Sequence, residues 1–183
     1  MKKISAITVT TLIVIACSSF TSYSQSGNEL AYQSQKGSDE APDYLTVNPS
    51  SKMLRNDVSI KVVRDFTKQF KNVSGEKWYK ISDGLIAQFT ESEIETKVEY
   101  DLNGNWHCTL RTYSEDKLPF DVRDIVKSKY YDFNILVAYE ITHFDNVTYI
   151  LKIEDSKQLK TLQISNGNME VIGDYVRGQN FVS

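Results

Sequence analysis

The feature that most constrains the fold of this chain is a pattern that occurs twice. Apolar side chains recur at every fourth position over residues 58–70, and the same spacing returns over residues 118–130. A four-residue spacing places these side chains on one face of a helix. Each helical stretch is followed by four short runs of alternating apolar and polar residues, which indicate antiparallel strands. The sequence therefore predicts an α+β fold of two tandem helix-plus-antiparallel-sheet (α-β4) repeats.

The eight predicted strands are short and are separated by turn-forming residues. In the first repeat they cover residues 76–81, 84–91, 94–101 and 106–113, and in the second they cover 134–143, 146–155, 157–165 and 169–176. Asp57 is the expected N-cap of the first helix, because its carboxylate can accept a hydrogen bond from a free N–H of the first turn. Pro119 fits the first turn of the second helix, where an N–H donor is not needed.

The stretch DLNGNW, residues 101–106, admits two interpretations, a calcium loop or a hairpin turn. A calcium-binding EF-hand loop starting at Asp101 would need glycine at its sixth position and glutamate at its twelfth, but Trp106 and Thr112 occupy these positions. The centre of the stretch recurs 63 residues later as ISNGNM, where Ile164 replaces the aspartate. Asn-Gly between alternating strands is typical of a type I′ turn, whose two central residues both need positive φ. We therefore expect a hairpin turn in both repeats.

The N-terminal residues have the three-part pattern of a secretory signal. Two lysines precede an apolar run over residues 4–16, and small polar residues follow it. Cleavage after Ser24 would make residues 1–24 a signal peptide and would place the mature chain in the periplasm or outside the cell. An alternative stays open, because residues 14–17 (VIAC) resemble a lipobox, in which Cys17 would be lipidated and would anchor the protein in the cell envelope. An uncleaved anchor is a third interpretation.

Residues 25–52 are rich in Ser, Gln, Asn and acidic residues and show no sustained periodicity, so we expect a flexible polar linker there. The domain is expected over residues 53–178, with repeat one at 53–115, repeat two at 116–178 and a tail at 179–183. Removal of residues 1–24 takes away two lysines and no acids, so the formal net charge changes from -3 to -5. An acidic chain argues against nucleic acid as a partner, because binding to phosphates requires a basic face.

The sequence shows no pattern that indicates catalysis, a metal ion or a cofactor. His107 and Cys108 are neighbours in a predicted strand and should point to opposite faces, while His143 belongs to the other repeat. A zinc site that uses these side chains together is therefore not expected. No G-x-S-x-G motif is present. We expect a protein that is not an enzyme and that needs no cofactor.

Alternation along the strands assigns each side chain to an inner face under the helices or to an outer face open to solvent. In the strand over residues 106–113 it places Trp106, Cys108 and Leu110 on the inner face. The outer face then carries aromatic, basic and aliphatic side chains together, which is typical of protein-binding surfaces. The residues predicted to contact a partner are Tyr79, His107, Arg111, Tyr113 and Ile150.

The unit of a helix, a strand tryptophan and a Y-D-x-N-G-N-W turn resembles the PepSY-like family of secreted bacterial proteins, also described as β-lactamase-inhibitor-like. The matching residues are Val62, Phe66 and Phe70 in the first helix, Trp78 in a strand, YDLNGNW at 100–106, and Leu118-Pro119 at the second helix. The resemblance covers about residues 53–176. The second repeat departs from it, because Tyr139 replaces the strand tryptophan and Met169 replaces Trp106.

This resemblance implies two helix-plus-sheet repeats arranged as in the β-lactamase inhibitory protein, whose concave sheet grips an enzyme. It also implies an extracytoplasmic location and no established catalytic activity. Inhibition of a β-lactamase is not implied for this chain, because the family name records shared shape.

The leading hypothesis from the sequence is a non-catalytic secreted or periplasmic protein whose outer sheet face binds an envelope or secreted protein, as an inhibitor or regulator of an envelope enzyme. The alternative is a module that binds a small ligand or a peptide, either in a groove between helix and sheet or along a free strand edge. An uncharacterised enzyme is the third interpretation, and it has no motif to support it. Contact with a membrane is expected only if Cys17 is lipidated.

Overall fold

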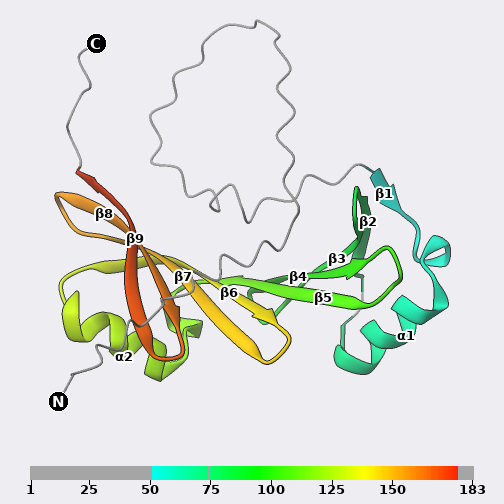
Figure 1. Ribbon diagram of the computed structural model, residues 1–183, viewed down its shortest axis with the longest axis horizontal. Coiled ribbons are helices and arrows are strands. Elements are labelled where there is room, and N and C mark those ends of the chain that lie inside the picture. Colours follow the sequence, from blue (N-terminus) through cyan, green and yellow to red (C-terminus); the bar gives the residue numbers. More distant parts are fainter. Residues whose placement is uncertain (1–50, 74, 177–183) are drawn as a thin grey trace, which may run out of the picture.

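The computed structural model describes residues 51–73 and 75–176 (Figure 1). The predicted signal peptide, Cys17, most of the predicted linker and the predicted tail lie outside the described residues. The elements in chain order are β1 (Ser51–Met53), the 3-10 helix η2 (Arg55–Asp57), α1 (Ile60–Gln69), β2 (Lys77–Ile81), β3 (Gly84–Glu91), β4 (Ile94–Asp101), β5 (Trp106–Tyr113), the 3-10 helix η3 (Glu115–Lys117), α2 (Phe120–Lys129), β6 (Asn134–His143), β7 (Asn146–Glu154), β8 (Gln158–Ser165) and β9 (Asn168–Val176).

All nine strands belong to one antiparallel sheet, in which each strand pairs with the next one along the chain. Strands β2–β5 follow α1, strands β6–β9 follow α2, and the two groups join where residues 109–113 of β5 pair with residues 138–142 of β6. The eight strands predicted from alternation are confirmed, each within one residue of its expected bounds. The additional strand β1 includes Ser51 and Lys52, which the sequence had placed in the linker.

The N-cap of the first helix lies two residues later than predicted. Ser59 is the N-cap of α1, and its hydroxyl oxygen accepts a hydrogen bond from the backbone N–H of Val62 at 3.4 Å. The prediction of Asp57 as the cap is wrong, because Asp57 is the last residue of η2 and its N–H already bonds to the carbonyl oxygen of Leu54. Pro119 is the N-cap of α2, directly before its first turn.

Both helices pack on the same face of the sheet, one near each end of it (Figure 1), and we call this the helix-covered face. The α1 cluster on this face consists of Val58, Val62, Phe66, Trp78, Ala87, Phe89, Val98 and Tyr100. The α2 cluster consists of Tyr113, Leu118, Val122, Val126, Phe133, Ile135, Ala138, Leu151, Ile153, Leu162 and Ile164. Each helix therefore buries its apolar stripe against its own four strands, which is how an amphipathic helix stabilises an open sheet.

A third group of apolar residues lies on the opposite face, which neither helix covers and which we call the helix-free face. Tyr139 and Ile150 pair across β6 and β7 and are 3% and 2% exposed. Half-buried Leu110, Val137 and Ile141 pack against them, and we call these five residues the outer cluster. The sheet thus has apolar residues on both faces where β5, β6 and β7 meet.

The two Asn-Gly stretches form different turns. In ISNGNM, Asn166 and Gly167 have φ of 52° and 76°, and Ser165 pairs with Asn168, so the predicted two-residue type I′ turn is present. In DLNGNW, β4 ends at residue 101 and β5 begins at residue 106, and within this four-residue loop only Gly104 has a positive φ, 71°. The prediction of a type I′ turn is wrong for this first stretch.

Contacts with α1 account for the longer loop. The carboxylate of Asp101 accepts hydrogen bonds from the backbone N–H of Asn105 at 2.8 Å and from its side-chain amide at 3.0 Å. The ammonium group of Lys61, in the first turn of α1, donates to the carbonyl oxygen of Asn103 at 2.9 Å and to Oδ1 of Asn105 at 2.6 Å. Lys61 thus binds the side-chain oxygen of Asn105, which the calcium interpretation would have made a metal ligand.

Candidate protein-binding site

Simple alternation assigns the wrong faces to most of β5, because a β-bulge interrupts its pairing with β4. The pairing advances by one residue on β4, from Glu99 to Tyr100, but by two residues on β5, from Cys108 to Trp106. The extra residue is His107. Trp106 still packs against the α1 cluster, as predicted, but every position after the bulge is shifted to the opposite face.

The prediction that Arg111 and Tyr113 lie opposite the helices is therefore wrong. Tyr113 belongs to the α2 cluster, and its hydroxyl group donates a hydrogen bond to Oε2 of Glu140 at 2.8 Å. Nη1 of Arg111 lies 2.5 Å from Oε1 of the same carboxylate. Burial raises the pKa of Tyr113 well above its usual range, and the hydrogen bond to Glu140 raises it further. The side chains of Arg111, Tyr113 and Glu140 thus bond to one another at the junction of β5 and β6. We therefore expect them to stabilise the sheet and not to contact a partner protein.

Two other predicted contact residues do lie on the helix-free face, but far apart. Tyr79 pairs with Ile86 in β2 and β3, whereas Ile150 is in β7. Five strand spacings separate β2 from β7, which corresponds to about 24 Å at the usual distance between neighbouring strands. Ile150 is also almost fully buried. The residues predicted from the sequence therefore do not converge on one site.

The outer cluster is the apolar surface that sequence reasoning missed. Leu110 was expected under the helices, but the bulge turns it to the helix-free face, where it lies next to Ile141 in the paired strand β6. A signal for this surface exists in the sequence, because ILVAY at residues 135–139 is apolar without alternation. Such a run is typical of a strand that is buried on both faces. Here one face meets α2 and the other carries the outer cluster.

Glu99 of β4 lies on the same face, on the strand next to the one that carries Leu110, and its carboxyl group has an unusual pKa. Burial, and then the negative charge of Asp83, raise the pKa of Glu99 to about 7. Its neighbours on this face include Ile86, with which it pairs in β3. With a pKa of about 7, the carboxyl group is neutral in about half of the molecules at pH 7, which lowers the cost of covering this face with another apolar surface.

Replacement of Glu99 by glutamine should change how stability depends on pH. Because the pKa in the fold, about 7, lies above the ordinary 4.5, the native protein is stabilised by the protonated form and loses this stabilisation as pH rises from 4.5 through 7. Glu99→Gln should therefore be more stable than the native protein above pH 7 and about equal to it below pH 4.5. Urea unfolding at both pH values measures this, with exposed Glu91→Gln as the control. A difference that does not vary with pH would contradict the burial of Glu99.

An aromatic rim, formed by Trp106, His107, His143 and Phe144, lies at the end of the β6–β7 hairpin. The His107 and His143 rings are 5.1 Å apart between centroids, and the Phe144 ring is 4.4 Å from His143 and 6.3 Å from Trp106. Burial lowers the pKa of His143, and the charge of His107 lowers it further. Phe144 is 66% exposed and has a φ of 50°, which is strained for a bulky residue. The rim lies at the end of β6, the strand that also carries Val137, Tyr139 and Ile141 of the outer cluster, and it includes the predicted contact residue His107.

Other kinds of site find little support in the described part of the chain. Among residues 51–73 and 75–176, no group of three or more His, Cys, Asp or Glu side chains is placed to hold a metal ion. None of the helices within these residues has the length and apolar character needed to cross a membrane.

Comparison with known proteins gives matches only among solved structures. No family model matches the sequence, and no curated protein matches it. A BLIP-like protein from Bacteroides fragilis NCTC 9343 aligns with a TM-score of 0.52 and 18% identity, over 68% of this chain and 90% of that one. A DUF2874 family protein from Bacteroides uniformis ATCC 8492 aligns with a TM-score of 0.51 and 14% identity, over 65% and 89% of the two chains. A protein from Bacteroides eggerthii DSM 20697, described as a "putative" periplasmic protein, aligns with a TM-score of 0.50 and 12% identity, over 64% and 88%.

These similarities establish the class of fold. The chain has the BLIP-like fold, in which a long antiparallel sheet carries two helices on one face. At 12–18% identity, the similarity extends to the fold and no further.

Proposed function

We propose that this chain is a non-catalytic protein of the periplasm or the extracellular space, which binds another protein through the helix-free face of its sheet. The partner would be an envelope or secreted protein, and the chain would act on it as an inhibitor or regulator. The signal pattern in residues 1–24 and the periplasmic description of a structural neighbour support the location. Lipidation at Cys17 is the alternative way for the protein to stay in the envelope.

The observation that carries this proposal is the outer cluster. A sheet face that no helix covers normally carries polar side chains, but here Leu110, Val137 and Ile141 are only half-buried around an apolar centre. The raised pKa of Glu99 reduces the charge beside them. Apolar surface flanked by polar and aromatic side chains is characteristic of the core of a protein interface.

The order of elements supports a further part of the proposal, that the fold arose from two copies of one unit. A 3-10 helix, an α-helix of 10 residues and four antiparallel strands occur in this order from η2 to β5 and again from η3 to β9. We also propose membership of the PepSY-like family on the motifs described above. In this interpretation the helix-free face belongs to both units, because the outer cluster lies around the β5–β6 junction.

Charged substitutions in the outer cluster test the binding face. Leu110→Glu and Ile141→Glu should each reduce recovery of the partner about tenfold or more, because a buried charge at the centre of an interface is poorly tolerated. The measurement is cross-linking and capture from envelope extracts, quantified by mass spectrometry. Val171→Glu is the matched control, because Val171 is 42% exposed and pairs with Leu162 of the α2 cluster. If both cluster variants capture the same proteins as the control, the helix-free face is not the binding face.

A further inference from the structure

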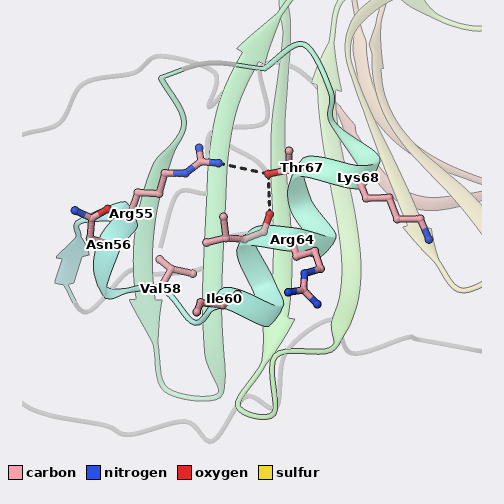
Figure 2. A pocket seen from close by; sticks show the side chains of 8 residues that line it. Arg55, Asn56, Val58, Ile60, Arg64, Thr67 and Lys68 are labelled. Carbon is pink, nitrogen blue, oxygen red and sulfur yellow. Dashed lines mark hydrogen bonds between the residues drawn. The ribbon is translucent and has the colours of Figure 1, made fainter.

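A groove runs along the surface of α1, away from the helix-free face. It has a volume of about 770 Å³ and is open to solvent. Figure 2 shows the side chains of η2 and α1 that line it. Val58, Ile60 and Val63 supply apolar side chains to it, and Ile60 is 76% exposed. Exposed Ile60 and half-buried Val63 therefore leave apolar surface open to solvent in the groove.

Three cationic side chains surround this apolar surface. Arg55 reaches across one end of the groove, where it forms an ion pair with Glu76 and donates a hydrogen bond to Oγ1 of Thr67 at 3.4 Å (Figure 2). Arg64 and Lys68 line the groove one helical turn apart, and both are exposed. Within residues 51–73 and 75–176, neither of these two has an ion-pair partner. The groove therefore suits an extended segment that has carboxylates beside apolar side chains.

The sequence directly before β1 has this composition. Residues 39–47 read DEAPDYLTV, with three acidic residues followed by Tyr44, Leu45 and Val47. The last of them is four residues from Ser51, where β1 begins, and four residues span at most about 14 Å. The groove begins at Arg55, four residues further along the chain. A segment tethered at this distance is present at an effective concentration in the millimolar range.

We propose that residues 39–47 of the same chain bind in this groove, with their carboxylates against Arg64 and Lys68 and their apolar side chains over Ile60 and Val63. This contact goes beyond the proposed partner binding, because it uses the opposite side of the molecule. It directs the N-terminal part of the chain to the α1 side and leaves the helix-free face open to a partner.

Photo-crosslinking in the full 183-residue chain tests this contact. Tyr44 is replaced by the photoreactive amino acid p-benzoylphenylalanine, and the crosslinked peptides are identified after irradiation and digestion. Crosslinks within one molecule should concentrate in residues 55–68. In the Arg64→Glu/Lys68→Glu background their yield should fall about fivefold, which corresponds to the loss of two exposed ion pairs. Lys71→Glu/Lys129→Glu is the control, because both lysines are exposed, neither lines the groove, and the change in net charge is the same.

Two further results decide the proposal. Replacing Asp39, Glu40 and Asp43 with lysine in the Arg64→Glu/Lys68→Glu background should restore the crosslinks, because the charges are then exchanged across the contact. Crosslinks to β6 and β7, crosslinks between molecules, or equal yields in the groove variant and the control would each overturn it. Failure of the Leu110→Glu test would not affect this result, since the two experiments probe opposite sides of the sheet.

Discussion

Replacing Phe66 with alanine is expected to lower the free energy of unfolding by about 4 kcal/mol, because truncating a buried phenylalanine leaves a cavity that the core fills only in part. Phe66 is 1% exposed, and its ring lies 5.2 Å from those of Phe70 and Trp78 and 5.6 Å from that of Phe89. The side chain thus joins α1 to β2 and β3. Its loss removes edge-to-face contacts with two rings as well as buried area.

Urea unfolding measures this change with two probes. Both tryptophans, Trp78 and Trp106, lie in or against the α1 cluster, so fluorescence reports on that half of the sheet, while far-ultraviolet circular dichroism reports on all strands. Phe120→Ala is the matched control, since Phe120 is in α2 but 81% exposed, and it should leave stability almost unchanged. A loss below about 1 kcal/mol for Phe66→Ala would mean that α1 is not packed as described. Separate transitions for the two probes would show that the two halves unfold independently.

Gly84→Ala should destabilise the protein by about 3 kcal/mol, because it forces an atom into the backbone of the neighbouring strand. A Cβ atom at Gly84 would lie 1.8 Å from the carbonyl oxygen of Tyr100. The clash is with backbone, so no side-chain rotation can relieve it, and β3 and β4 would have to separate where Gly84 pairs with Asp101. The free energy of unfolding and the thermal midpoint both report the change.

Gly167→Ala provides the comparison for this effect. Gly167 lies in the type I′ turn with a φ of 76°, and nothing lies within 4 Å of a Cβ built there. The cost of this substitution is therefore backbone strain alone, about 1 kcal/mol. If Gly84→Ala costs no more than Gly167→Ala, the close approach of β3 to Tyr100 does not exist.

The elements themselves were predictable because they depend on local periodicity. The four-residue apolar spacing in residues 58–70 placed α1, and alternation placed eight strands within one residue of their bounds. The cap of α1 was missed by two residues, because Ser59 and Asp57 are both good capping residues, and only the formation of η2, which ends at Asp57, decides between them. The turn at DLNGNW was also not predictable from local sequence. It shares Asn-Gly with ISNGNM, yet it forms a longer loop that Lys61 of α1 contacts.

The candidate site was less predictable, because it depends on which face each side chain occupies. One extra residue, His107, moves Arg111 and Tyr113 under the helices and turns Leu110 outwards. Nothing within β5 marks the bulge, since it arises from the pairing of β5 with β4. The groove beside α1 was also not predicted, because its lining comes from two separate elements, η2 and α1, whose packing depends on the fold.

The sequence by itself determined the two helices and eight of the nine strands, together with their order, because helix and strand periods depend on neighbouring residues. It also determined the acidic character of the chain. Only the tertiary structure decided the single nine-stranded sheet, the helix-free face with its outer cluster, and the loop form of DLNGNW. Each of these depends on strand pairing and on contacts between distant residues, and a shift of one residue in pairing reverses every face that follows it.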